Sequence, residues 1–145
     1  HTFTAQLAYL RDRQRLPAFL AGQPVSAVNG NPLPDTNAVD RTNVFRAKAS
    51  YVYDAHYGGS LAFFNQTGTT DSALYDPTRV SGNISGNPAV RGWTYEAFWT
   101  PVQYMRIGLQ YTRYGKYNGA SHNYDGFGRN ASDNDSLFLY VWAAY

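Results

Sequence analysis

Residues 104–113 read Tyr104-Met105-Arg106-Ile107-Gly108-Leu109-Gln110-Tyr111-Thr112-Arg113. Apolar and polar residues alternate along most of this stretch, and successive side chains of a β-strand point to opposite faces. One face of the predicted strand therefore suits lipid and the other suits water. The apolar face consists of Met105, Ile107, Leu109 and Tyr111.

Five other stretches show strand patterns of comparable length. They are residues 3–11, 44–53, 60–67, 93–100 and 136–145. The last of them has Leu137, Leu139 and Val141 on one face and aromatic residues on the other, so we expect both of its faces to be covered. Membrane-spanning strands need about 9–11 residues. The sequence thus predicts an all-β chain with about six antiparallel strands in meander order.

The connections between these strands alternate in length. Two are short turns, at about 54–59 and 100–103, and Pro101 is expected to end the strand before it. Three are long and rich in Gly, Asn, Pro, Ser and Asp, at about 14–42, 68–91 and 115–134. Outer-membrane barrels have short periplasmic turns and long outer loops. We therefore interpret residues 1–145 as one segment of a transmembrane β-barrel.

The composition fits strands and excludes several functions. Aromatic residues make up 17% of the chain and charged residues only 15%, and there is no Cys. The absence of Cys excludes disulfides, thiolate metal sites and C-x-x-C-H haem attachment on this segment, so no cofactor is predicted. Basic residues do not gather into a run, so no nucleic-acid partner is expected. The mean hydropathy of −0.47 is compatible with a barrel, whose two faces average to polar.

The end of the chain carries a family resemblance. Residues Ser136 to Tyr145, with apolar residues at alternate positions and a terminal aromatic, resemble the C-terminal signal strand of Gram-negative outer-membrane β-barrels. The resemblance implies a location in the outer membrane and recognition by the barrel-assembly machinery through Tyr145, Val141 and Leu139. Residues 119–135 are similar to uncharacterised proteobacterial outer-membrane proteins, some of them grouped with cytochrome-associated barrels.

Six strands are too few for a single-chain barrel of this kind, which has at least about eight. An open sheet in lipid would leave unpaired backbone groups at its edges. We favour the interpretation that the chain is the C-terminal portion of a larger barrel. Two alternatives remain: several chains sharing one barrel, or two further strands within 17–42, where four prolines argue against strands.

Charged residues on the predicted polar faces are candidates for the lumen wall. Glu96 and Arg106 lie about equally far from the turn at 101–103 and could pair across the hairpin. Such charges would bias ion passage, or would simply brace a polar wall. The predicted lumen-lining residues are Arg46, Lys48, Glu96, Arg106 and Gln110. The predicted lipid-facing residues are Met105, Ile107, Leu109, Tyr111, Leu137, Leu139 and Val141.

Two membrane interfaces are indicated by residues near the strand ends. Aromatic residues gather at both ends, as in the girdles of barrels. Arg11, Arg13 and Arg113 fall at the outer ends of lipid-facing alternations, at the height of lipopolysaccharide phosphates. A solvated strand end is the competing interpretation. The expected partners are thus the lipid bilayer and lipopolysaccharide.

Metal binding and catalysis lack positive support. Oxygen ligands gather in one Gly-rich loop, but their spacing does not fit an EF-hand, so a polar loop is favoured. The three His residues are dispersed, and no catalytic motif is present. The loop residues concerned are Asp125, Asp133, Asn134 and Asp135.

Three functions are compatible with the sequence. The leading hypothesis is a non-enzymatic outer-membrane pore, porin-like, for small polar solutes or ions. The second is a structural sheath for an electron-transfer partner such as a multihaem cytochrome. The third is a soluble β-sandwich or lipocalin-like binding protein, disfavoured because the strands exceed the usual five or six residues.

Overall fold

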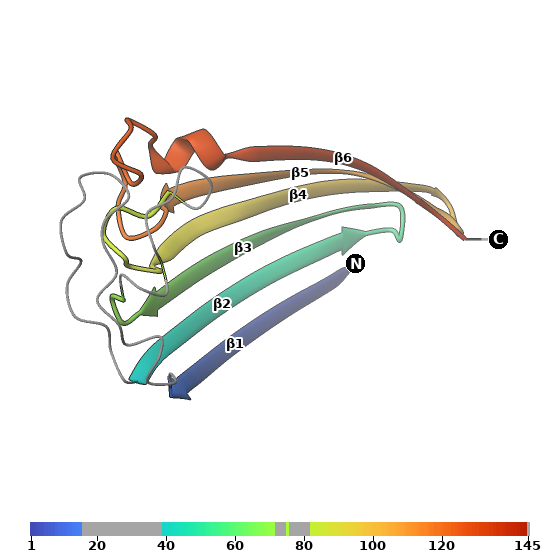
Figure 1. Ribbon diagram of the computed structural model, residues 1–145. Helices are drawn as coiled ribbons and strands as arrows, with labels where there is room; N and C mark the ends of the chain where they lie inside the picture. Colours follow the sequence, from blue (N-terminus) through green and yellow to red (C-terminus); the bar gives the residue numbers. More distant parts are fainter. Residues whose placement is uncertain (16–38, 72–74, 76–81, 145) are drawn as a thin grey trace.

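The two-residue alternation forms a single antiparallel sheet in the computed structural model (Figure 1), which describes residues 1–15, 39–71, 75 and 82–144. Six strands follow in the order of the chain, from β1 to β6. The all-β class and the six-stranded antiparallel meander are therefore confirmed. The strands are β1 (Thr2–Arg15), β2 (Val39–Tyr53), β3 (Tyr57–Gly68), β4 (Val90–Val102), β5 (Met105–Lys116) and β6 (Ser136–Ala143).

The register sorts the side chains into two chemically different faces. Glu96 of β4 lies opposite Ser60 of β3 and Gln110 of β5. One residue earlier, Tyr95 lies opposite Leu61 and Tyr111. We call the side with Glu96 the polar face and the side with Tyr95 the apolar face. Alternation continues outward on both sides, because Leu7 pairs with Ala47 and Leu139 with Leu109.

Exposure of the two faces is the reverse of that in a water-soluble sheet. In β4 and β5 the apolar-face residues Tyr95, Trp99 and Leu109 are 44%, 46% and 46% exposed. Their polar-face neighbours Thr94, Glu96 and Gln110 are all less exposed. Within the described residues, no element covers the apolar face.

All strands bend in the same direction, and the two kinds of connection lie at opposite ends of the sheet (Figure 1). The short links are residues 54–56 and 103–104, at the end where both chain termini lie. The described parts of the β3–β4 and β5–β6 links lie at the other end, and the β5–β6 link contains the 3-10 helix η2 (Ala131–Asn134). In the part of the chain that the structure describes, no helix is long and apolar enough to cross a membrane.

Several strand ends differ from the expected positions. Proline was expected to end a strand at Pro101, but β4 continues to Val102. The pairing of β4 with β5 is irregular between Trp99 and Val102, and such an irregularity accommodates a residue that cannot donate a backbone hydrogen bond. At the opposite end, β1 and β2 extend to Arg15 and from Val39. The predicted long loop at 14–42 is accordingly shorter.

Among the described residues, the most tightly packed part is a cluster of loops rather than the sheet. Tyr124 is only 1% exposed, and its ring lies 5.0 Å from that of Tyr117. Its hydroxyl donates to Asn134 at 3.2 Å, and its carbonyl accepts the Ile84 N–H at 3.0 Å. Residues 82–89 of the β3–β4 link and 117–134 of the β5–β6 link are thereby joined.

Within the described residues, both edges of the sheet are unpaired. Every residue of β1 is exposed, and β6 is exposed on both faces, with Phe138 at 58% and Leu139 at 74%. Neither edge strand pairs with the other, because the sheet ends at β1 and at β6. The sheet is therefore not closed into a barrel by these six strands.

Aromatic rings lie against glycines on the polar face. Gly108 lies opposite Tyr140, and a Cβ atom at Gly108 would overlap the Tyr140 ring. Gly58 lies opposite Phe98, whose ring fills the same position there. Glycine in a strand permits this close approach and allows a sheet to curve.

We predict that Gly108→Ala destabilises the sheet by about 1–3 kcal/mol, because the added methyl displaces the Tyr140 ring. The free energy of unfolding from a urea titration followed by tryptophan fluorescence measures the effect. Gly115→Ala is the matched control, since the nearest atom to its Cβ would be 3.9 Å away. Equal stability of the two variants would contradict the role assigned to the ring.

Candidate functional site: the polar face of the sheet

Glu96 is the centre of a hydrogen-bonded group that spans four strands. Its Oε1 accepts the Tyr140 hydroxyl of β6 at 2.6 Å, and its Oε2 accepts the Ser60 hydroxyl of β3 at 2.9 Å. Lys48 of β2 places its Nζ 3.7 Å from the same Oε2. The Glu96 side chain is 16% exposed and that of Lys48 is 44% exposed. The carboxylate is therefore neutralised by one cation and held by two hydroxyls.

Arg106 does not form the expected cross-hairpin pair with Glu96. Its guanidinium lies 3.6 Å from the centroid of the Phe98 ring, and the register places Trp142 opposite it on β6. The residue opposite Glu96 on β5 is Gln110. The expectation failed because β4 continues to Val102 and the turn lies at 103–104, which brings Gln110 rather than Arg106 opposite Glu96. Arg106 instead stacks on the ring of Phe98 in a cation–π contact.

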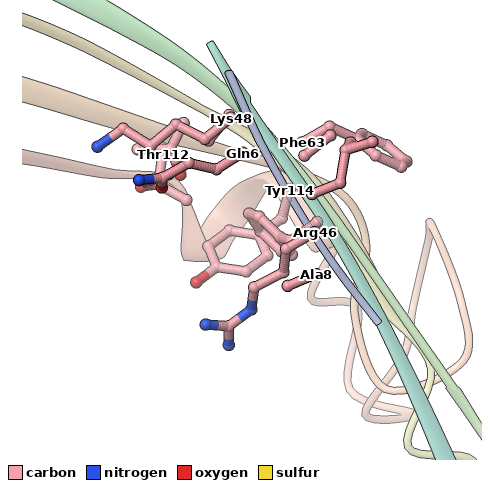
Figure 2. A pocket seen from close by; sticks show the side chains of 12 residues that line it. Gln6, Ala8, Arg46, Lys48, Phe63, Thr112 and Tyr114 are labelled. Atoms are coloured by element: carbon pink, nitrogen blue, oxygen red, sulfur yellow. Dashed lines mark hydrogen bonds between the residues drawn. The ribbon is translucent and has the colours of Figure 1, made fainter. Parts of the chain in front are cut away.

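Arg46 and Lys48 flank a hollow on the polar side (Figure 2), together with Gln6 of β1 and Thr112 and Tyr114 of β5. Figure 2 shows these polar side chains on one side of the strands and Phe63 on the other. Arg46 is exposed and makes no hydrogen bond or ion pair with any other described residue. Thr94 and Thr112 close the floor with hydroxyls 3.3 Å apart.

The structure thus places all five predicted lumen residues on one face. The seven predicted lipid-facing residues lie together on the opposite face. Of the predicted assembly signal, Val141 and Leu139 lie on β6 at 61% and 74% exposure, and Tyr145 lies outside the described residues. Whether these faces meet water and lipid stays a prediction.

The loop oxygens considered as cation ligands are engaged separately. Asp125 Oδ1 accepts the backbone N–H groups of Phe127 and Arg129 at 2.9 and 3.1 Å. Asp133 caps the N–H of Asn130, and Asp135 accepts the Tyr111 hydroxyl. The described residues contain no group of three or more His, Asp or Glu that could hold a metal ion. These carboxylates therefore hold the loop backbone and the Tyr111 hydroxyl.

The pKa of Asp125 lies below its ordinary value. Burial raises this pKa, but the hydrogen bonds from the backbone amides of Phe127 and Arg129 and the nearby Arg129 charge lower it by more. The carboxylate form is therefore the form that orders the loop around Tyr124.

Two features of this face were not predicted from the sequence. Tyr140 and Glu96 are 44 positions apart in the sequence, so their hydrogen bond depends on the alignment of distant strands. In the sequence, Tyr140 was interpreted as part of a second apolar face. The glycine–aromatic contacts need the register between strands. The available signal for these contacts was the presence of glycine and aromatic residues at polar-face positions, such as Gly108 and Phe98.

No protein-family model matches the chain, and the searches of curated proteins and of solved structures return no match.

We predict that Glu96→Leu lowers the free energy of unfolding by about 1–3 kcal/mol, because it leaves the Tyr140 and Ser60 hydroxyls without their acceptor. Glu96→Gln, which keeps an acceptor oxygen, should lose less. Urea titrations of the two variants and the parent protein measure the difference. The assignment fails if the glutamine variant is the less stable of the two.

We predict that the loop around Tyr124 loosens as the pH falls through the native pKa of Asp125. A carboxylate whose pKa is lowered by folding contributes stability above its unfolded pKa of about 3.9, and this contribution is lost as acid protonates the native state. Hydrogen exchange of the Phe127 and Arg129 amides should accelerate there beyond the intrinsic rate. Asp125→Asn, which still offers an acceptor, should remove this acid dependence, and an unchanged dependence would contradict the assignment.

Proposed function

We propose that this sheet is part of the wall of an outer-membrane β-barrel that forms a pore for small polar solutes or ions. In this proposal the apolar face contacts lipid and the polar face lines the aqueous lumen. The resemblance of residues 136–145 to a C-terminal signal strand supports the location and an encounter with the barrel-assembly machinery.

The reversed exposure of the two faces carries the proposal. Leu7, Leu61 and Leu139 belong to three different strands and are 78%, 43% and 74% exposed on the same face. Soluble monomers rarely expose a continuous apolar surface of this extent. A lipid environment removes the free-energy cost of exposing these side chains, because acyl chains are as apolar as the side chains.

The strand lengths also support the proposal. The shortest of the first five strands has 12 residues, which at about 3.3 Å per residue is roughly 40 Å long. With a tilt of about 40° such a strand still crosses an apolar band of about 25 Å. These strands are at least about twice as long as the typical strand of a soluble protein.

The polar face carries the charged and hydroxyl groups expected of a wall that lines an aqueous lumen. Glu96 is paired with Lys48 and with hydroxyls, whereas Arg106 stacks on the Phe98 ring and Arg46 is exposed. Rings of charged side chains determine ion selectivity in pores. Arg46, which is exposed and without a partner among the described residues, is the best placed to act on passing ions.

The open edges imply further strands in the assembled barrel. Backbone N–H and C=O groups at the free edges of β1 and β6 cannot remain unpaired in lipid. We therefore propose that additional strands pair with both edges. Phe138 and Trp142, exposed on the polar face at 58% and 56%, would then be covered by neighbouring wall or by material inside the barrel.

The competing proposal is a soluble β-sandwich that binds a ligand. Such a fold needs a second layer over the apolar face. None of the described residues forms that layer. Extraction distinguishes the two functions. We expect the intact protein to need detergent for extraction and to migrate differently on a gel before and after heating. Extraction by salt or alkali alone would contradict the membrane assignment.

Ion conductance tests the pore. We expect the intact protein to produce stepwise currents in planar bilayers, and Arg46→Glu to shift the reversal potential in a KCl gradient toward that of K⁺. Arg46→Lys is the matched control and should leave the reversal potential nearly unchanged. A detergent-requiring protein that conducts no current and co-purifies with a haem-staining partner would instead support a sheath.

A further inference from the structure

All charged residues on the apolar face are cations, and all of them lie at its loop end. Arg11 and Arg13 of β1 and Arg41 of β2 share this face with Leu7 and Phe45. No apolar-face position in the described strands holds Asp or Glu. We call this group the basic belt. Its members are Arg11, Arg13, Arg15, Arg41, Arg91, Arg113 and Lys116.

The belt contains two like-charge pairs directly opposite each other. Arg13 pairs in register with Arg41, and Arg91 pairs with Lys116. The second pair lies beside the register shift between Arg91 and Gly92, which places Lys116 rather than Gly115 opposite Arg91. Directly opposed like charges destabilise a sheet. An anion placed between each pair would reverse the sign of this interaction.

The arginines of β4 and β5 line a hollow together with aromatic rings. Arg91, Arg113, Trp93 and Tyr95 border a depression of about 480 Å³ on the central strands. Arg113 and Trp93 are directly opposite in the register. The hollow therefore offers guanidinium groups beside ring surfaces, which suits a ligand that is anionic at one end and apolar next to it.

The carboxylate of Asp135 is engaged by two tyrosines. Its Oδ2 accepts the Tyr111 hydroxyl at 2.8 Å, and its Oδ1 accepts the N–H of Tyr114, which lines the hollow, at 2.7 Å. Neither oxygen forms an ion pair with an arginine of the belt within the described residues. The arginines of the belt are all exposed, so their charges are available to an external anion.

We infer that the basic belt binds the phosphate groups of anionic lipids in the membrane leaflet that faces the loops. This inference rests on the proposed membrane location. Guanidinium groups bind phosphate oxygens through paired charge-assisted hydrogen bonds. The belt borders the exposed apolar face directly, so a lipid can place its phosphate on Arg91 and Arg113 and its acyl chains on the leucines beyond. A nucleic acid would leave those leucines in water.

Trp93 provides the reporter for the test. The chain has three tryptophans, and Trp99→Phe with Trp142→Phe leaves only Trp93, beside the belt. The full chain is inserted into phosphatidylcholine vesicles that contain either bromine-labelled phosphatidic acid or bromine-labelled phosphatidylcholine. Bromine quenches tryptophan on contact, so the ratio of the two quenching curves gives the relative affinity for the anionic phosphate.

We expect about a fivefold or greater preference for phosphatidic acid, as one cation near a lipid phosphate contributes about this factor. Arg91→Gln with Lys116→Gln should reduce the preference to below about twofold, and Arg113→Gln alone should reduce it in part. The matched control, Arg46→Gln with Arg106→Gln, removes two cations from the polar face and should leave the preference unchanged. Heat-dependent gel mobility identifies the variants that are folded.

The outcomes separate this inference from the proposed function. Trp93 that neither lipid quenches would place the apolar face outside the bilayer and overturn both. Equal quenching by the two lipids in the parent protein would overturn the belt and leave the membrane location intact. A control variant that loses as much preference as the belt variants, or a belt that binds single-stranded DNA more tightly than phosphatidic acid, would also overturn it.

Discussion

Strict alternation in a fixed register is the constraint on which the rest of this structure depends. A slip of one residue between two strands would move every side chain to the other face. The pairing of Glu96 with Ser60 and Gln110 keeps polar groups together over the central strands. The contacts of Tyr140 and Phe98 with glycines of neighbouring strands add steric specificity to that register. The chemical difference between the faces is thus built into the hydrogen-bonding pattern of the backbone.

This constraint separates two kinds of stabilisation. The sheet has few buried side chains, and its polar face is held by a carboxylate with hydroxyl and ammonium partners. The loop end resembles the interior of a soluble protein, with Tyr124 and Ala131 almost fully buried. Such a division is expected if the surroundings of the sheet, rather than a protein core, complete its packing. The local structure around Tyr124 then needs no contribution from that environment.

The sequence predicted the fold well where the alternation within a single strand was sufficient. The alternation of Met105, Ile107 and Leu109 correctly predicted β5, and the Gly-rich stretches correctly separated the strands. It failed where two distant strands had to be aligned. Arg106 was expected to meet Glu96 but stacks on Phe98, and Pro101 was expected to end a strand that continues to Val102. The partner of Glu96, Tyr140, could not be found because its position depends on the accumulated register of β4, β5 and β6.

The loop contacts have a mechanical consequence for the strands that they connect. The β3–β4 and β5–β6 links are joined through Tyr124 and Ile84, and Thr69 holds the Arg41 backbone of β2 to the same end. Strands β2 to β6 are therefore tied together both along their lengths and at one end. Among the described residues β1 is held only by its pairing with β2. A seam of lower local stability should run between these two strands, and opening of the sheet should begin there.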